Sequence, residues 1–236
     1  MAARLLPRVR RRLLLVVDDV HELPPDSGAV TVLRELAGHT VDRLQLVLLS
    51  RRPLPFSLAR DRGRGRLTEL HAPELALGAL EVDALLDAAL PNGDPALGAL
   101  VREHADGWPA AVRIVVEALR SVDGRDAAAV LDRLGRPGGP LYEYLAEEVV
   151  DQEPAPVREL LRWLALLGDA DPASLAGTID AGAPALLPDL VRRGLVREGP
   201  GRDRWSLVRP LREHFAQDDV LPARRRAALH GMIAAR

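Results

Sequence analysis

Two adjacent acids follow an apolar run near the start of the chain, in the segment LLLVVDDVHEL. A short aliphatic run is typical of a strand in a parallel sheet, and such a strand ends at the edge where open α/β sheets bind ligands. There Asp18 could hold Mg²⁺ through water, and Asp19 could orient an attacking water, which is chemistry for cleaving a phosphate anhydride. The alternative is that both aspartates only end a strand and begin a turn.

Two further segments carry residue types that suit a nucleotide. In LVLLSRRPLP, Arg51 follows Ser50 after a second apolar run, and its guanidinium could sense a terminal phosphate through charge-assisted hydrogen bonds. In DGWPAAVRI, the turn formed by Gly107, Trp108 and Pro109 opens a helix. The rigid ring of Pro109 could pack against the flat face of an adenine. The ordinary alternatives are a solvated loop arginine and a helix start with a buried tryptophan.

The elements that must position the acids and Arg51 can be identified from apolar periodicity. Residues 13–17 form a short continuous aliphatic run, and residues 44–49 are aliphatic except for Gln45. Both segments predict strands buried on both faces. Residues 29–37 between them have helical spacing, so this part of the chain predicts a strand-helix-strand crossover with parallel strands. Residues 67–70 predict a third short strand.

Helical patterns dominate the remainder of the chain. The sequence 194–207 contains two short strands around a Gly/Pro turn, which predicts a β-hairpin, and three short helices followed by a hairpin is a winged-helix pattern. The segment RPGGP at 136–140 is the best linker candidate. The predicted fold class is α/β followed by mainly α. The predicted helices span 81–90, 95–105, 109–119, 127–134, 141–150, 157–167, 172–178, 184–193, 209–218 and 222–236.

Composition excludes several classes of function. The net charge is -2, which gives no global basic bias toward nucleic acid, and cysteine is absent, which excludes disulfides and thiol chemistry. All 32 basic residues counted as Lys or Arg are arginine, so no reaction can use a lysine amine. Aromatics make up 3% of the residues, so Leu, Val and Ala must form the core. With no signal peptide and no apolar segment of membrane-spanning length, we expect a cytoplasmic protein without membrane contact.

The motifs occur in a fixed order, and as a set they resemble the STAND class of signal-transduction ATPases. Within that class the chain is most similar to the large ATP-binding LuxR-type transcriptional regulators, of the maltose-regulator kind. The resemblance covers essentially the whole chain. The matching residues are Asp18, Asp19 and His21; Ser50 and Arg51; the segment RGRLTEL at 64–70; and Gly107, Trp108 and Pro109.

The resemblance implies a domain layout and a set of cofactors. It divides the chain into a partial P-loop-type nucleotide-binding α/β domain with the Walker B half of the sheet (1–72), a helical domain (73–138), a winged-helix domain (139–220) and the start of a helical repeat region (221–236). The complete protein would bind ATP or ADP with Mg²⁺, self-associate in the ATP state, and contact DNA through a C-terminal domain outside this sequence.

Two departures from the family pattern set the expected activity. The first 17 residues contain neither glycine nor lysine, so no phosphate-binding loop precedes Asp18 here, and we expect the chain to be inactive as an ATPase without an additional N-terminal segment. Family members often carry a winged-helix histidine that reaches the ADP phosphate. Val208 stands at that position, the adjacent Arg209 could replace it, and His214 is expected at the surface.

Two alternative functions remain open. A non-catalytic interaction module derived from such an ATPase would pack against a partner ATPase or pair through an open sheet edge. A winged-helix DNA-binding protein would use the arginines at 224–226 on phosphate backbones, although a lid within the same molecule is the more ordinary role for this domain.

Overall fold

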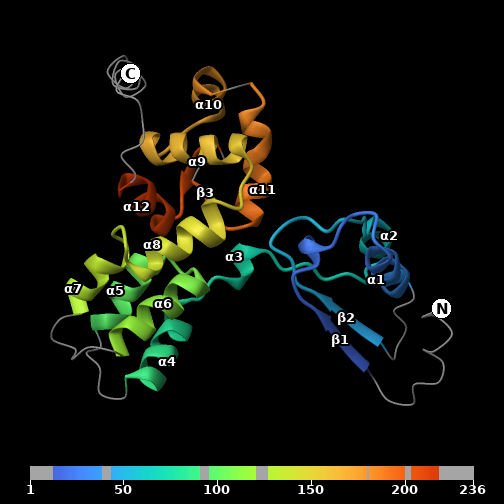
Figure 1. Ribbon diagram of the computed structural model, residues 1–236, viewed down its shortest axis with the longest axis horizontal. Coiled ribbons are helices and arrows are strands. Elements are labelled where there is room, and N and C mark those ends of the chain that lie inside the picture. The colour runs from blue at the N-terminus through green and yellow to red at the C-terminus, as the bar shows by residue number, and fades with distance from the viewer. Residues whose placement is uncertain are drawn as a thin grey trace. The chain divides into compact units, whose positions relative to one another are not determined.

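The computed structural model describes residues 13–38, 44–90, 96–120, 127–179, 181–199 and 203–217, and the chain divides into two units, Met1–Leu70 and His71–Arg236 (Figure 1). The first unit contains a small parallel sheet with short helices, and the second contains helices and one antiparallel hairpin. This confirms the predicted α/β class with a mainly helical remainder. Among the described helices, none has the length and apolar content needed to cross a membrane.

The sheet of the first unit is built as the apolar periodicity predicted. Strands β1 (Leu13–Val17) and β2 (Leu44–Leu48) pair in parallel, with Leu13 opposite Leu44 and Val17 opposite Leu48. Helix α1 (Gly28–Gly38) lies between them in the chain and buries Val30, Leu33 and Ala37, whose spacing places them on one helical face. The predicted crossover unit is therefore confirmed.

The prediction that both strands are buried on both faces was wrong. Within β2 only Leu44 is buried and Gln45 is exposed, and β1 is more open still. Leu13, Leu14 and Val16 are 44%, 58% and 51% exposed. Parallel strands are usually covered on both faces and flanked by further strands. In the part of the chain that the structure describes, β1 pairs with β2 alone, so its apolar side chains stay open.

The third strand predicted at 67–70 was also wrong. The structure describes these residues, and they belong to no strand. Instead, the Glu69 carboxylate accepts two hydrogen bonds from the Arg62 guanidinium at 2.7 and 2.6 Å, which ties this segment to helix α2 (Ala59–Gly63). A run of four residues with two polar members offers too little apolar surface to join a sheet.

Helices make up most of the second unit, and Figure 1 shows α4 to α7 grouped at one end of it and α9 to α12 with β3 at the other. The predicted helices from 81 to 193 and at 209–218 are confirmed where the chain is described. Their bounds are α3 (Ala72–Leu75), α4 (Ala79–Ala89), α5 (Ala96–Ala105), α6 (Pro109–Arg120), α7 (Ala127–Leu134), α8 (Pro140–Leu145), a π turn (Ala146–Val150), α9 (Ala155–Leu167), α10 (Pro172–Thr178), a 3₁₀ turn (Ala183–Leu186), α11 (Leu187–Arg192) and α12 (Arg209–Gln217).

A single aliphatic core runs from α4 to α12 and contains mostly Leu, Val and Ala, as the low aromatic content predicted. Helix α8 contacts α6, α7 and α12 and so joins the two ends of the unit. The segment 136–140, predicted as a linker, is a tight turn. A Cβ at Gly139 would lie 2.4 Å from the carbonyl oxygen of Arg133, because the chain folds directly back onto the end of α7.

The hairpin and the last described helix complete this unit. Strands β3 (Val196–Glu198) and β4 (Trp205–Leu207) pair antiparallel, which confirms the predicted hairpin. The prediction that His214 lies at the surface was wrong, since this residue is only 4% exposed. Helix α12 packs on α8, and the His214 ring lies against the Tyr142 ring with 4.4 Å between their centroids. The predicted helix at 222–236 and its arginines lie outside the described residues.

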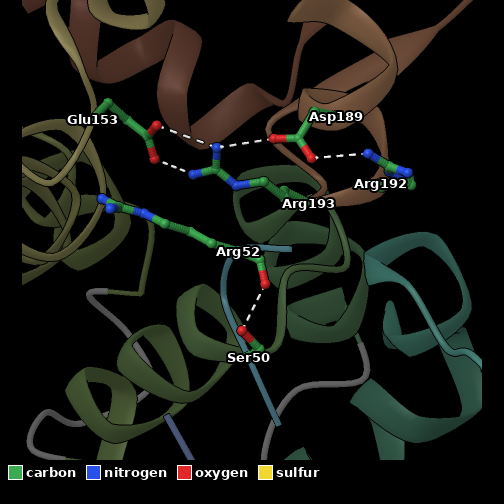
Figure 2. Close-up of polar contacts among 6 residues, drawn as sticks. All are labelled: Ser50, Arg52, Glu153, Asp189, Arg192 and Arg193. Carbon is green, nitrogen blue, oxygen red and sulfur yellow. Dashed lines mark hydrogen bonds and ion pairs between the residues drawn. The ribbon is translucent and has the colours of Figure 1, made fainter. Parts of the chain in front are cut away.

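One buried ion pair holds α11 against the chain that follows the π turn. Glu153 is 5% exposed, and its carboxylate accepts hydrogen bonds from both terminal nitrogens of Arg193 (Figure 2). Asp189 accepts a further bond from Arg193 at 3.4 Å and one from Arg192 at 3.1 Å. A buried carboxylate needs such a partner, because an unpaired charge in the interior is strongly unfavourable.

Candidate functional site

The ends of β1 and β2 remain hydrogen-bonded beyond the strands themselves. The Leu49 N–H donates to the Val17 carbonyl at 2.9 Å, and the Val20 N–H donates to the Leu49 carbonyl at 3.1 Å. The two segments that carry the predicted residues, Asp18-Asp19 and Ser50-Arg51, therefore leave the sheet side by side at its carboxyl edge. This is the edge where open parallel sheets bind ligands.

The second acid adopts a conformation that is uncommon for residues other than glycine. Asp19 has φ 50° and ψ 40°, in the left-handed region, and its N–H donates to the Asp18 carboxylate at 2.9 Å. Aspartate tolerates this region better than most residues, yet non-glycine residues there are found more often at functional sites. Both acids are exposed, so their carboxylates are accessible to a hydrated cation.

The ring of His21 joins the acid segment to the second strand end. Its Nδ1 accepts a hydrogen bond from the Arg51 N–H at 3.4 Å and lies 3.9 Å from Oδ1 of Asp19. The Ser50 hydroxyl donates to the Arg52 carbonyl at 2.6 Å and fixes the same loop (Figure 2).

In the second unit, the turn at Gly107, Trp108 and Pro109 connects α5 to α6. Gly107 has φ 74°, and its carbonyl accepts a hydrogen bond from the Leu77 N–H at 2.8 Å. A Cβ at position 107 would lie 3.1 Å from the Leu77 carbonyl oxygen, so both the conformation and the space require glycine. Pro109 is the first residue of α6, where its missing N–H costs no hydrogen bond.

Trp108 is half-buried, and its ring meets the Tyr144 ring edge to face, with 6.4 Å between centroids and 69° between planes. Its backbone N–H donates to the Ala105 carbonyl at 2.9 Å. The backbone hydrogen bond and the ring contact with Tyr144 together fix the position of Trp108. A fixed and partly exposed aromatic ring is suited to pack against a flat ligand.

Arg209 opens α12 and lies beside the same turn. Its guanidinium donates to Glu103 at 2.7 Å and to Glu213 at 2.5 Å, and its backbone N–H donates to the Asp106 carboxylate at 3.0 Å. The hydrogen bond with Glu103, and then that with Glu213, raises the pKa of Arg209. In turn, the hydrogen bond from Arg209 lowers the pKa of Glu103. A phosphate at Arg209 would have to displace one of these carboxylates.

The structure gathers the predicted residues in two groups. Asp18, Asp19 and Arg51 lie at one edge in the first unit, while the Gly-Trp-Pro turn and Arg209 lie together in the second. Their roles toward a nucleotide stay predictions. Sequence reasoning missed Asp106, Glu103 and Arg197, which hold the second group in place, since no local pattern distinguishes them from solvated charges.

The carboxyl edge of the sheet that carries Asp18 and Asp19, here called the acid edge, suits one kind of cation site. In the described ranges, no group of three or more His, Cys, Asp or Glu side chains converges as ligands for a dehydrated metal ion. Mg²⁺ keeps several of its waters in proteins and needs only one or two carboxylates. The exposed Asp18 carboxylate therefore fits a hydrated Mg²⁺, and Asp19 lies next to it.

Comparisons with known proteins agree with the motif order. No protein-family model matches the chain. The HTH-type transcriptional regulator MalT of Yersinia enterocolitica is 27% identical over 235 residues, which is 94% of this chain and 26% of that protein. MalT of Serratia proteamaculans is 26% identical over 232 residues, with the same shares. The chain thus spans about a quarter of the length of the relatives it matches.

Solved structures give only a loose likeness. The Thermotoga maritima RuvB Holliday junction branch migration motor has a TM-score of 0.41 and 16% identity, covering 87% of this chain and 70% of that one. A mutant of the same protein reaches 0.43 at 15% identity, covering 93% and 74%. Such scores do not establish a shared arrangement of elements.

The sequence similarity is spread over nearly the whole chain, and it confirms the relationship that the ordered motifs predicted. Over nearly its whole length, the chain is a homologue of a segment of the HTH-type transcriptional regulator MalT.

Proposed function

We propose that this chain is part of the ATP-binding signal-transduction module, of the STAND type, of a LuxR-family transcriptional regulator, and that it works as a nucleotide-dependent switch. The observation that carries the proposal is the sheet edge at which Asp18, Asp19, His21, Ser50 and Arg51 meet. These residues carry the motifs that mark the family, and they lie where such sheets bind ligands. Contact with DNA and with an inducer would belong to the rest of a protein of MalT length.

Each residue of the site has a role in this proposal. Asp18 would hold a hydrated Mg²⁺, and Asp19 would orient water toward the terminal phosphate. Arg51 contacts that phosphate through charge-assisted hydrogen bonds. When bound, ATP supplies the reactive anhydride and Mg²⁺ neutralises its charge.

Within the second unit, the Gly-Trp-Pro turn is the proposed adenine contact. Trp108 and Pro109 pack on the base, and Arg209 contacts a phosphate after exchange with Glu103. A winged-helix domain that serves as a lid within the molecule is proposed for residues 139–220. It would include α9 to α11, the β3–β4 hairpin and α12.

The chain alone is proposed to be inactive as an ATPase. A phosphate-binding loop uses backbone N–H groups of a Gly-rich segment and a lysine amine. The sequence contains no lysine, so an additional segment must cradle the phosphates. We expect ATP turnover of the 236-residue chain to equal that of an Asp18→Ala variant.

The decisive experiment extends the chain at its N-terminus with a phosphate-binding segment of the pattern Gly-x-x-x-x-Gly-Lys-Ser/Thr, which the resemblance implies. Calorimetry should then show ATP binding that depends on Mg²⁺ and weakens about tenfold or more in Asp18→Ala. The control is Asp87→Ala, which removes an exposed carboxylate from α4. Equal Mg²⁺-dependent affinity in the extended wild type and its Asp18→Ala variant would refute the role of the acid edge.

A second candidate function, a non-catalytic interaction module, is favoured by the exposed β1. Leu13, Leu14 and Val16 present an apolar strand that further strands or a partner protein would cover. If this is the function, Leu14→Lys should abolish association of the chain with itself or with a partner ATPase in light scattering, while nucleotide has no effect. A wild-type chain that stays monomeric alone and with the partner would exclude it.

The DNA-binding alternative has less support from the described residues. The hairpin arginines Arg197 and Arg204 are in ion pairs with Asp106 and Asp169, both at 2.6 Å. Guanidinium groups that are already paired gain less from phosphate contacts, because an existing ion pair must be broken first.

A further inference from the structure

A single carboxylate, Asp106, contacts two elements of the second unit, β3 and α12. Oδ1 lies 2.6 Å from Nη1 of Arg197 on β3, and Oδ2 accepts the backbone N–H of Arg209 at the start of α12 at 3.0 Å. The Asp106 carbonyl accepts a second bond from the Arg197 guanidinium at 2.7 Å. We call Asp106, Arg197 and Arg209 the Asp106 junction.

Asp106 acts as a cap for a helix that begins 103 residues later in the chain. The first N–H groups of an α-helix have no partner within the helix, and a carboxylate at this end is favoured by the helix dipole. Helix α12 has nine residues, and its second residue, Pro210, has no N–H to donate. The Arg209 N–H is therefore the first donor of this helix, and Asp106 satisfies it.

The backbone of Asp106 is fixed for the same geometry. Asp106 has φ 55° and is followed by Gly107 at φ 74°, so two consecutive residues adopt left-handed conformations. Such a pair reverses the chain between α5 and α6 and directs the Asp106 side chain to the hairpin and α12. The side chain is 21% exposed, so solvent screens this ion pair less than a fully exposed one.

The adjacent α5 turn adds a second tie to α12. Glu103, one turn before Asp106, accepts a bond from the Arg209 guanidinium at 2.7 Å. The Asp106 carboxylate thus accepts the backbone N–H of Arg209, and the Glu103 carboxylate accepts a hydrogen bond from its guanidinium. The Gly-Trp-Pro turn follows Asp106 directly in the chain and leads into α6. Its position relative to α12 therefore depends on the contacts of Asp106 and Glu103 with Arg209.

We propose that Asp106 is the positioning residue for Trp108, fixing the Gly-Trp-Pro turn against β3 and α12. Its role toward a ligand rests on the proposed function, because that function places adenine on Trp108. In this arrangement, a base packed on Trp108 acts on α12 through the Asp106 junction. No separate contact between base and α12 is needed.

The test uses the full 236-residue chain without nucleotide, labelled with 5-fluorotryptophan. Its three tryptophans give three ¹⁹F resonances, and Trp108→Phe assigns one of them. Asp106→Ala should shift the Trp108 resonance, and it should accelerate hydrogen exchange at the Arg209 amide by about tenfold, since a hydrogen bond to a charged group is lost. Asp106→Asn should restore most of both readouts, because asparagine tolerates the left-handed region and its Oδ1 still accepts the N–H.

Asp169→Asn is the matched control, because Asp169 also holds an arginine, Arg204, through its carboxylate and carbonyl. It should leave the Trp108 resonance and the Arg209 amide unchanged. An unchanged Trp108 resonance in Asp106→Ala, or an equal change in Asp169→Asn, would overturn the proposal. If Asp106→Ala fails to fold by circular dichroism, the comparison passes to Arg197→Gln, which removes the guanidinium partner of the Asp106 carboxylate. This variant must then shift the Trp108 resonance, and an unchanged resonance would overturn the proposal. Because no nucleotide is present, failure of nucleotide binding leaves this result intact.

Discussion

The guanidinium of Arg209 donates to the carboxylate of Glu103 at 2.7 Å, which joins α12 to the last turn of α5. This hydrogen bond is the main reason that the pKa of Glu103 lies below its ordinary value of 4.5. A carboxylate with a lowered pKa in the folded state stabilises the fold at pH values above the unfolded pKa. That stabilisation is lost as the pH falls through the lowered value.

Replacement of Arg209 by glutamine should therefore raise the pKa of Glu103 toward 4.5. A ¹³C NMR titration of the labelled carboxyl group measures this directly. The control is Arg197→Gln, because Arg197 pairs with Asp106 rather than with Glu103. An unchanged Glu103 titration in Arg209→Gln would contradict the assigned cause.

His21 should set the position of the Arg51 backbone. Replacement by alanine removes the acceptor for the Arg51 N–H, so this amide should exchange several-fold faster, and the free energy of unfolding should fall by about 1 kcal/mol. His21→Asn keeps an acceptor near the Nδ1 position and should recover part of the loss. Hydrogen exchange by mass spectrometry gives the measurement, and equal protection in wild type and His21→Ala would count against the contact.

Gly107→Ala should destabilise the turn for two reasons at once. The residue has φ 74°, and the new Cβ would meet the Leu77 carbonyl oxygen at 3.1 Å, so we expect a loss of roughly 1–3 kcal/mol in urea unfolding. Gly138→Ala is the matched control, because Gly138 has φ 82° and a Cβ added there would have no atom within 4 Å. Equal losses would show that backbone conformation alone accounts for the effect.

Removing one partner of the buried Glu153–Arg193 pair should be costly. Glu153 is 5% exposed, so Arg193→Ala leaves a buried carboxylate without its main partner, and the expected loss is about 3–5 kcal/mol. The control is Arg136→Ala in the pair with Asp132, whose side chains are 59% and 62% exposed, where a change of about 0.5 kcal/mol is expected. Similar denaturation midpoints for the two variants would argue against a buried pair.

The sequence determined the local elements and the identity of the acid edge. The strands β1 and β2, helix α1 and the β3–β4 hairpin follow from side-chain patterns that span only a few residues. These patterns are mostly aliphatic segments, helical spacing of apolar residues and a Gly/Pro turn. The order of the Asp-Asp, Ser-Arg and Gly-Trp-Pro motifs was sufficient to predict the relationship to LuxR-type regulators, because it is a property of the sequence itself.

Only the tertiary structure decided which side chains are buried and which are partners. The Asp106 contacts join residues 91 and 103 positions apart, and the burial of His214 depends on the packing of α12 against α8. The exposure of Leu14 depends equally on which strands lie beside β1. Periodicity reports which face of an element is apolar, but burial and pairing depend on distant segments that local pattern does not encode.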